Sequence, residues 1–152
     1  MSSLRTEFLF EIKMALLPPQ NVGVTPYGDR RIRYLEGGTF SGPKIHGEVL
    51  PWGADWVLLR SDGARYLDVR LTLRADDDHL VYVTARGIMD VSPETFQRLV
   101  GGEDVSPEDY YFRTTPLFET ASEKYAWLNR VVAVTVGSIR GTAVRHMVYA
   151  VL

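Results

Sequence analysis

The chain has 152 residues, a formal net charge of −2 and no cysteine. A charge so close to neutral gives no electrostatic basis for binding nucleic acid or an anionic membrane. The absence of cysteine excludes disulfides, thiolate metal sites and cysteine nucleophiles. No apolar run approaches the roughly 20 residues of a membrane span, and Glu7, Glu11 and Lys13 interrupt the segment where a signal peptide would be apolar. We therefore expect one cytoplasmic domain over residues 1–152.

The N-terminal part of the chain indicates short strands separated by turn residues. Between Thr6 and Leu16 apolar side chains occupy every second position, which is the period of a strand with one buried face. Pro18-Pro19 ends this strand. A bulge or sharp bend is expected at Gly37-Gly38, because glycine inside a strand pattern often marks one. Further strands are predicted over residues 22–27, 31–40, 44–50 and 55–60.

The next segment predicts a pair of long strands. Ser61-Asp62-Gly63 has the composition of a tight hairpin turn, in which glycine supplies the positive φ. Residues 65–75 form the first strand, and residues 79–89 return as its partner. Between them Asp76-Asp77-Asp78 is expected to be a solvated turn. The first strand separates an apolar face (Leu67, Val69, Leu71 and Leu73) from a polar one (Tyr66, Asp68, Arg70, Thr72 and Arg74).

The C-terminal part adds a short helix and more strands. Ser92 fits the N-cap of this helix, Pro93 fits its first position, and Gly101-Gly102 ends it. A strand over residues 110–119 should be interrupted at Pro116, and residues 122–127 form one helical turn. A closing hairpin joins residues 130–139 to residues 143–152. Both faces of the strand over 130–139 are apolar, so we expect both to be covered.

Eight to ten strands with one or two short helices indicate an all-β fold. An antiparallel barrel, closed or nearly closed, is favoured because closure removes exposed strand edges. The alternative is an open sandwich of two sheets. A barrel of about eight strands has an interior that is either filled by side chains or wide enough for one small ligand.

Most catalytic signatures are missing from the sequence. The glycines lack a following helix start, so they do not form a phosphate-binding loop. No serine lies in a Gly-x-Ser-x-Gly nucleophile elbow. His46, His79 and His146 fall on three separate strands without metal-ligand spacing. We therefore predict neither a metal nor a cofactor.

Polar residues spaced by two on well-formed strands are the remaining candidates. Two interpretations stay open. Rows that point into the barrel would give a pocket with aromatic walls and a few fixed polar groups. Rows that point outward would be the solvated face of an antiparallel sheet. The rows are Tyr66, Asp68 and Arg70, then Tyr82, Thr84 and Arg86, then Tyr111, Arg113 and Glu119.

Within these rows Asp68 is the leading candidate, because aspartate is disfavoured in the middle of a strand. Asp55 is a second acid, or else a turn-capping residue. Arg113 and Glu119 either contact a substrate or form an ion pair that stabilises the Pro116 kink. The predicted catalytic residues are Asp68, Asp55, Arg113 and Tyr82, and the predicted ligand-binding residues are Trp56, Tyr66, Glu119, Trp127 and Asn129.

Several short motifs together carry a resemblance. They include Gly37-Gly38-Thr39-Phe40, Gly53-Ala54-Asp55-Trp56, Leu67-Asp68-Val69-Arg70, Tyr111-Phe112-Arg113-Thr114-Thr115-Pro116 and Tyr125-Ala126-Trp127-Leu128-Asn129. From about Leu9 to Leu152 the chain resembles domain-of-unknown-function family 3237. The resemblance implies a calycin-like β-barrel that forms a homo-oligomer, and it implies no particular activity. Trp52, where the family often has a glycine, and Asp76-Asp77-Asp78, in place of an Asp-Gly turn, depart from the pattern at loops of the barrel rim.

The leading hypothesis is a small-molecule-binding barrel that performs cofactor-free acid–base chemistry on a mostly apolar or aromatic metabolite. Asp68 or Asp55 would move the proton. Arg113, Asn129 or a tyrosine would stabilise the developing oxyanion. Isomerisation, cyclisation, hydration and elimination are the reactions that fit. The alternative is a non-catalytic carrier or sensor with the same pocket, and a purely structural oligomerisation domain would require a filled lumen.

Overall fold

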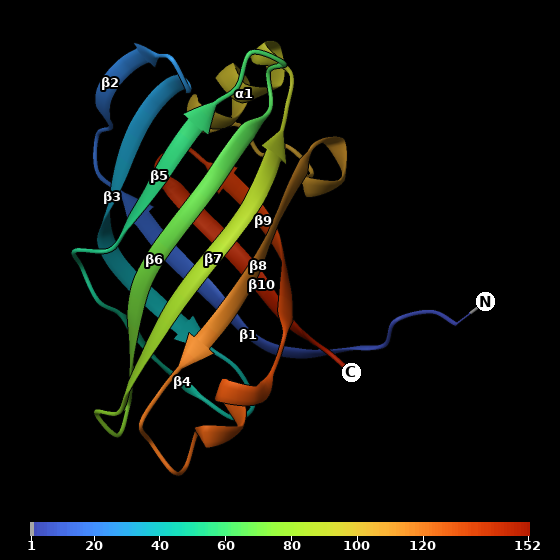
Figure 1. The fold of residues 1–152 in the computed structure, drawn as a ribbon. Helices are drawn as coiled ribbons and strands as arrows, with labels where there is room; N and C mark the ends of the chain where they lie inside the picture. The colour runs from blue at the N-terminus through green and yellow to red at the C-terminus, as the bar shows by residue number, and fades with distance from the viewer. Residues whose placement is uncertain (1) are drawn as a thin grey trace.

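The computed structural model describes residues 2–152, which fold into ten strands, one α-helix and two short 3₁₀ helices (Figure 1). No helix among these residues combines the length and the apolar character that a membrane crossing requires. The elements in chain order are β1 (Thr6–Leu16), β2 (Gln20–Thr25), β3 (Gly28–Ser41), β4 (His46–Val49), β5 (Ala54–Leu59), β6 (Arg65–Ala75), β7 (Leu80–Asp90), α1 (Pro93–Val100), η1 (Pro107–Asp109), β8 (Tyr111–Glu119), η2 (Ala126–Arg130), β9 (Ala133–Arg140) and β10 (Ala143–Val151).

The strands close into an antiparallel barrel. Neighbours pair in the order β1-β10-β9-β8-β7-β6, β5 joins β6 to β3, and β3 pairs with β1 to close the ring. Two strands are additional to this ring of eight. β4 occupies the rest of the space between β3 and β6, and β2 pairs with β3 alone. The β1–β3 pairing excludes the open sandwich and confirms the predicted barrel.

A bulge in β3 makes this closure possible. Ala15 pairs with Gly37, but Leu16 pairs with Leu35, so β3 has one extra residue at the position of the predicted bend. The first half of β3 can thereby pair with β5 and the second half with β1 and β4. Gly38 lies so close to β1 that an added Cβ would fall 2.0 Å from the Lys13 carbonyl oxygen. Glycine is therefore required there to let the two backbones meet.

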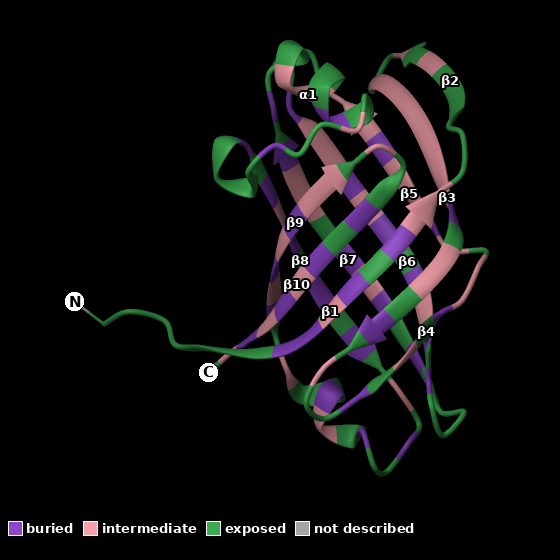
Figure 2. Cartoon of the chain, turned by 180° about the vertical axis from the view of Figure 1, so that it is seen from behind, coloured by how far each residue is buried: buried purple, intermediate pink, exposed green. Residues whose placement is uncertain are grey.

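The core fills much of the barrel interior. Buried and more exposed residues alternate along the strands, as Figure 2 shows for the far side of the barrel. On β6 the predicted apolar face, Leu67 to Leu73, points inward and is buried. Leu73, Val81 and Phe10 are fully buried. The inward direction of the apolar face also decides the direction of the polar one, because successive side chains of a strand point to opposite sides.

The helix α1 lies across one end of the barrel, the end at which β2 also lies (Figure 1). Ser92 accepts a hydrogen bond from the Thr95 amide at 3.1 Å, as predicted for the N-cap. The helix contacts the β9–β10 turn, where the Gly141 amide donates to the Leu99 carbonyl at 2.8 Å. Leu99 is fully buried beneath the helix. These contacts position α1 over the lumen.

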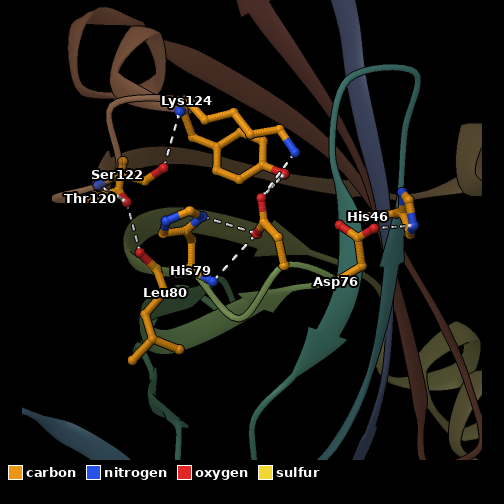
Figure 3. A network of polar contacts seen from close by, with 9 residues as sticks. His46, Asp76, His79, Leu80, Thr120, Ser122 and Lys124 are labelled. Atoms are coloured by element: carbon orange, nitrogen blue, oxygen red, sulfur yellow. Dashed lines mark hydrogen bonds and ion pairs between the residues drawn. The ribbon is translucent and has the colours of Figure 1, made fainter.

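The opposite end of the barrel, called the closed end below, carries a polar network around Asp77 in the β6–β7 turn (Figure 3). Asp77 accepts hydrogen bonds from Lys124 Nζ at 2.9 Å and from the Tyr125 hydroxyl at 3.2 Å. His79 Nδ1 lies 3.1 Å from its other oxygen. The contact with Lys124 is the main reason that the pKa of Asp77 is lowered. This turn was predicted to be merely solvated, but Asp77 holds it against the segment between β8 and η2.

Three local predictions were wrong. β8 runs through Pro116 without interruption. It pairs with β9 only at Arg113 and Thr114, so β9 forms no backbone hydrogen bonds with β8 at Pro116, and a proline is tolerated there. The helical turn predicted over residues 122–127 lies at Ala126–Arg130. The outer face of β9 is not fully covered: Val132, just before the strand, is 59% exposed and Val134 is only half-buried.

Candidate functional site

A cavity of about 60 Å³ lies within the barrel, near the end that α1 covers. Its wall is mostly apolar and includes Leu67 and Val69 of β6, Phe112 of β8 and Phe96 of α1. Five titratable side chains also line it: Arg31, Arg33, Asp55, Arg65 and His146. A mostly apolar cavity with a few fixed polar groups is the usual composition of a small-molecule site.

Asp55 is the only carboxylate on this wall among residues 2–152. It lies on β5 on the same face as buried Val57, directly across from Arg33 of β3. Its Oδ1 accepts a hydrogen bond from the Asp68 amide at 3.1 Å, which orients the carboxylate. Burial raises the pKa of Asp55 to about 7, with a further rise from the nearby Asp68 charge. The Asp68 amide and Arg33 favour the ionised form and oppose part of this shift.

Three arginines line the same cavity. Burial is the main cause of a lowered pKa at both Arg33 and Arg65, and repulsion from neighbouring arginines adds to it. Arg33 Nε is buried without a hydrogen-bond partner among the described residues. Arg31 donates to Asp29 Oδ2 at 2.9 Å. The Arg65 guanidinium stacks 3.8 Å from the centre of the Phe96 ring, so β6 and α1 meet over the cavity.

His146 is the polar group at the deeper part of the cavity. Burial lowers its pKa to about 4, so the imidazole is neutral at physiological pH. Its Nδ1 lies 3.4 Å from the Thr135 hydroxyl, which is itself 2.7 Å from the Thr114 hydroxyl. The edge of His146 packs on Phe112, with ring centres 5.1 Å apart. The other ring nitrogen, Nε2, is not in contact with the Thr135 hydroxyl.

Gly137 of β9 explains how Phe112 fits beside His146. A Cβ at position 137 would lie 2.6 Å from the Phe112 ring, which is closer than real Cβ contacts allow. The glycine thus makes room for the aromatic ring on the lumen side. Any larger residue would push Phe112 into the cavity or displace it.

The structure does not bring the predicted catalytic set together in the lumen. Asp55 faces the cavity, but Asp68, Tyr82 and Arg113 lie on the outer wall of the barrel. Their neighbours Leu67, Val83 and Phe112 occupy the inward positions. Of the two interpretations of the polar rows, the inward one is therefore wrong and the outward one holds, because the apolar face of each strand fills the interior. Asp68 lies beside Arg70, whose Nε is 4.0 Å from Oδ1, in a shallow hollow that Arg86 also lines.

The predicted ligand-binding residues also lie outside the cavity. Trp56 lines a hollow on the outer wall with Tyr82, and Tyr66 lines another with Arg113. Glu119 is exposed at the end of β8. Two residues belong to the closed end: Trp127 packs against the core, and Asn129 is occupied by hydrogen bonds with the Thr120 backbone at 2.8 and 2.9 Å. No ion pair joins Arg113 to Glu119 among the described residues.

The three histidines do not gather. His46 pairs with Asp76 at 3.2 Å and His79 with Asp77 at the closed end, whereas His146 lies in the lumen. Within residues 2–152 no three His, Cys, Asp or Glu side chains form a group suited to hold a metal ion.

Sequence reasoning missed the lumen residues Arg31, Arg33, Arg65, Phe96 and His146. A signal for four of them was present. Arg31 and Arg33 share their parity with buried Leu35, Arg65 shares its parity with Leu67, and His146 lies between Val144 and Val148. Each is a polar residue that interrupts an apolar face, whereas the rows that were chosen occupy the opposite face. Phe96 carries no such signal, because the docking of α1 places it.

The family model that matches residues 4–151 is DUF3237, described as a protein of unknown function. The chain belongs to this family. It is 35% identical over 144 residues to the UPF0311 protein RPA1785 of Rhodopseudomonas palustris, which covers 95% of this chain and 90% of that protein. The resemblance found in the sequence motifs is thereby confirmed.

Solved structures agree with the barrel. The RPA1785 structure from Rhodopseudomonas palustris matches with a TM-score of 0.93 at 34% identity and covers 100% of both chains. A β-barrel-like protein of Acinetobacter baumannii matches at 0.86 and 38% identity, covering 100% of this chain and 98% of the other. An enzyme from Penicillium herquei matches at 0.73 over 100% and 97% of the two chains, and at 22% identity this likeness concerns the fold alone.

Proposed function

We propose that the lumen binds a small, mostly apolar or aromatic metabolite and that Asp55 is its acid–base group. The observation that carries this proposal is the position of Asp55: a lone carboxylate on an apolar cavity wall, opposite Arg33 and oriented by the Asp68 amide. Asp68 itself acts from the outer wall, through its backbone and its charge, and is a positioning residue.

The chemistry follows from the environment of Asp55. A pKa of about 7 means that both protonation states are populated at neutral pH, so the carboxyl can accept a proton and return it. The guanidinium groups of Arg33 and Arg65 can donate hydrogen bonds to an oxyanion that develops beside it. Isomerisation, cyclisation, hydration and elimination need only these two functions. Arg33 and Arg65 thus take the role that the sequence assigned to Arg113 and Asn129.

The same cavity supports a second candidate, a non-catalytic carrier or sensor. Its small size and the cover formed by Arg65 and Phe96 would suit retention of a ligand as well as turnover. The Penicillium herquei chain with this fold is described as an enzyme, so the fold itself is compatible with catalysis. The homo-oligomer and the cytoplasmic location stay predictions.

The proposal is tested by comparing Asp55→Asn with Asp68→Asn. A panel of small carbonyl and enol compounds, short chains as well as single rings, is incubated with the protein in deuterated water, and NMR follows product and exchanged protons. Loss of a general acid–base typically lowers the rate by about 10²–10⁴-fold, and we expect that loss for Asp55→Asn with ligand affinity retained. Asp68→Asn should keep most of the activity.

Full turnover in Asp55→Asn would contradict the catalytic role. Ligand binding by the wild type without any turnover would favour the carrier instead.

A further inference from the structure

The lumen contains more positive than negative charge. Arg31, Arg33 and Arg65 line the cavity, and among residues 2–152 Asp55 is the only acid on its wall. Arginine stays charged at physiological pH, whereas Asp55 is only partly ionised there. Asp29 compensates Arg31 through a 2.9 Å contact. Arg33 and Arg65 therefore lack a full counter-charge.

Arg33 and Arg65 are half-buried, so part of their charge is removed from water. Such removal is unfavourable without an ionic or hydrogen-bonding partner. Arg33 Nε is buried without any partner in the described chain, and the Arg65 guanidinium packs on the face of the Phe96 ring. Two donor groups are thus held ready at one end of the cavity.

The rest of the cavity wall has the opposite character. It includes the apolar side chains of Phe112, Val69 and Met14. His146 is neutral, with Nδ1 engaged by Thr135. A ligand that fits both parts must be charged at one end and apolar at the other, with at most an uncharged polar atom near His146.

We propose that the ligand of this lumen is a compact organic anion, bound with its carboxylate or enolate oxygens on Arg33 and Arg65 and its short apolar chain against Phe112. This inference rests on the proposed function, since it assumes that the lumen is the binding site. A planar guanidinium suits the two oxygens of a carboxylate, which accept parallel hydrogen bonds. A cationic ligand would face uncompensated arginines and is excluded.

The cavity also limits the size of the ligand. A volume of about 60 Å³ corresponds to roughly four water molecules. A short-chain carboxylate of about four or five non-hydrogen atoms fills it, with the charged end at the side of Arg65 and Phe96. A ring as large as benzene, which needs a cavity of about 150 Å³, would have to displace that pair.

Propionate, propionamide and propylammonium test this inference, because they share a short chain and differ in charge. Binding is measured by calorimetry, and NMR shifts of the His146 and Phe112 rings report whether the probe is in the lumen. We expect propionate to bind at least about tenfold more tightly than propionamide, a difference of about 1.4 kcal/mol, and propylammonium not to bind. Arg33→Gln should remove the preference for propionate over propionamide.

Arg86→Gln is the matched control, since Arg86 is exposed on the outer wall of β7, and it should bind all three probes as the wild type does. Arg65→Gln gives a second test if Arg33→Gln does not fold. Equal binding of propionate and propionamide in the lumen would overturn the anion inference and leave the proposed function standing. Absence of lumen shifts with every probe at millimolar concentration would overturn both.

Discussion

Asp55 and Asp68 lie on opposite sides of the same barrel wall, joined by one hydrogen bond from the Asp68 amide to Asp55 Oδ1. Both are aspartates on neighbouring strands, 13 positions apart in the chain. Asp55 shares the apolar side of the wall with Val57, and burial raises its pKa to about 7. Asp68 shares the outer side with Arg70. The parity of the strand, and not the residue type, separates a candidate acid–base group from a surface carboxylate.

The largest difference between the two sides should be in stability. Phe112→Ala removes a lumen ring that is 4% exposed, and Tyr111→Ala removes its neighbour on the outer wall, which is 53% exposed. Truncating a buried phenylalanine typically costs about 3–5 kcal/mol, whereas surface changes usually stay within about 0.5 kcal/mol. Urea denaturation of both variants measures the contrast. Similar losses would mean that the outer wall contributes as much packing as the lumen.

Asp55→Asn should increase stability at neutral and higher pH. The unfolded chain has the ordinary carboxyl pKa of 3.8, and the folded protein binds the Asp55 proton more tightly, with a pKa of about 7. Ionisation in the fold therefore has a cost that is absent below pH about 4, grows as pH rises and is complete above about 7. Asparagine avoids a cost of at most about 4 kcal/mol. Denaturation at about pH 4 and about pH 8 measures it, with Asp68→Asn as the control. An equal effect at both pH values would contradict the raised pKa.

His146 should act in the opposite direction. Its pKa falls from the ordinary 6.5 to about 4 in the fold, so the unfolded chain binds its proton more tightly. The stability that neutral His146 provides is present above pH about 6.5 and is lost towards about 4, by at most about 3 kcal/mol. Comparing Asp55→Asn with Asp55→Asn plus His146→Gln isolates this loss, because Asp55 otherwise offsets it over the same range. Parallel pH profiles of the two variants would show that His146 does not titrate this way.

The smallest effect is electrostatic coupling across the β3–β5 pair. Arg33 lowers the pKa of Asp55, so Arg33→Gln should raise that pKa above about 7, by up to roughly 1 pH unit. Arg86→Gln, on the outer wall, should leave it unchanged. Carboxyl ¹³C chemical shifts of Asp55 followed through a pH titration provide the measurement. A downward change in Arg33→Gln would show that the guanidinium does not face the carboxylate.

Much of the fold was predictable because its signals are local. The alternation in residues 6–16 and 65–75 was enough to assign β1 and β6, and Ser92-Pro93 was enough to begin α1. The bulge at Gly37-Gly38 was expected for the same reason. Pro116 misled the prediction of β8, since a proline is tolerated where the neighbouring strand ends, and that depends on pairing with residues 20 or more positions away.

Less of the site was predictable. Of the nine residues proposed, Asp55 alone reaches the lumen cavity. The predicted polar rows are regularly spaced, and regular spacing is the mark of a solvated face. The lumen instead holds single polar residues that break an apolar face, such as Arg33 before Leu35 and His146 between two valines.

By itself the sequence determined that the chain is an antiparallel all-β fold and which side chains share a face on each strand, because both depend on local periodicity and turn chemistry. Only the tertiary structure decided that the sheet closes through the β1–β3 pairing and which polar groups meet. The position of Arg33 across from Asp55 depends on the register between β3 and β5, and the Arg65–Phe96 contact depends on how α1 docks. Both arrangements join segments that are distant in the chain, so local periodicity does not reveal them.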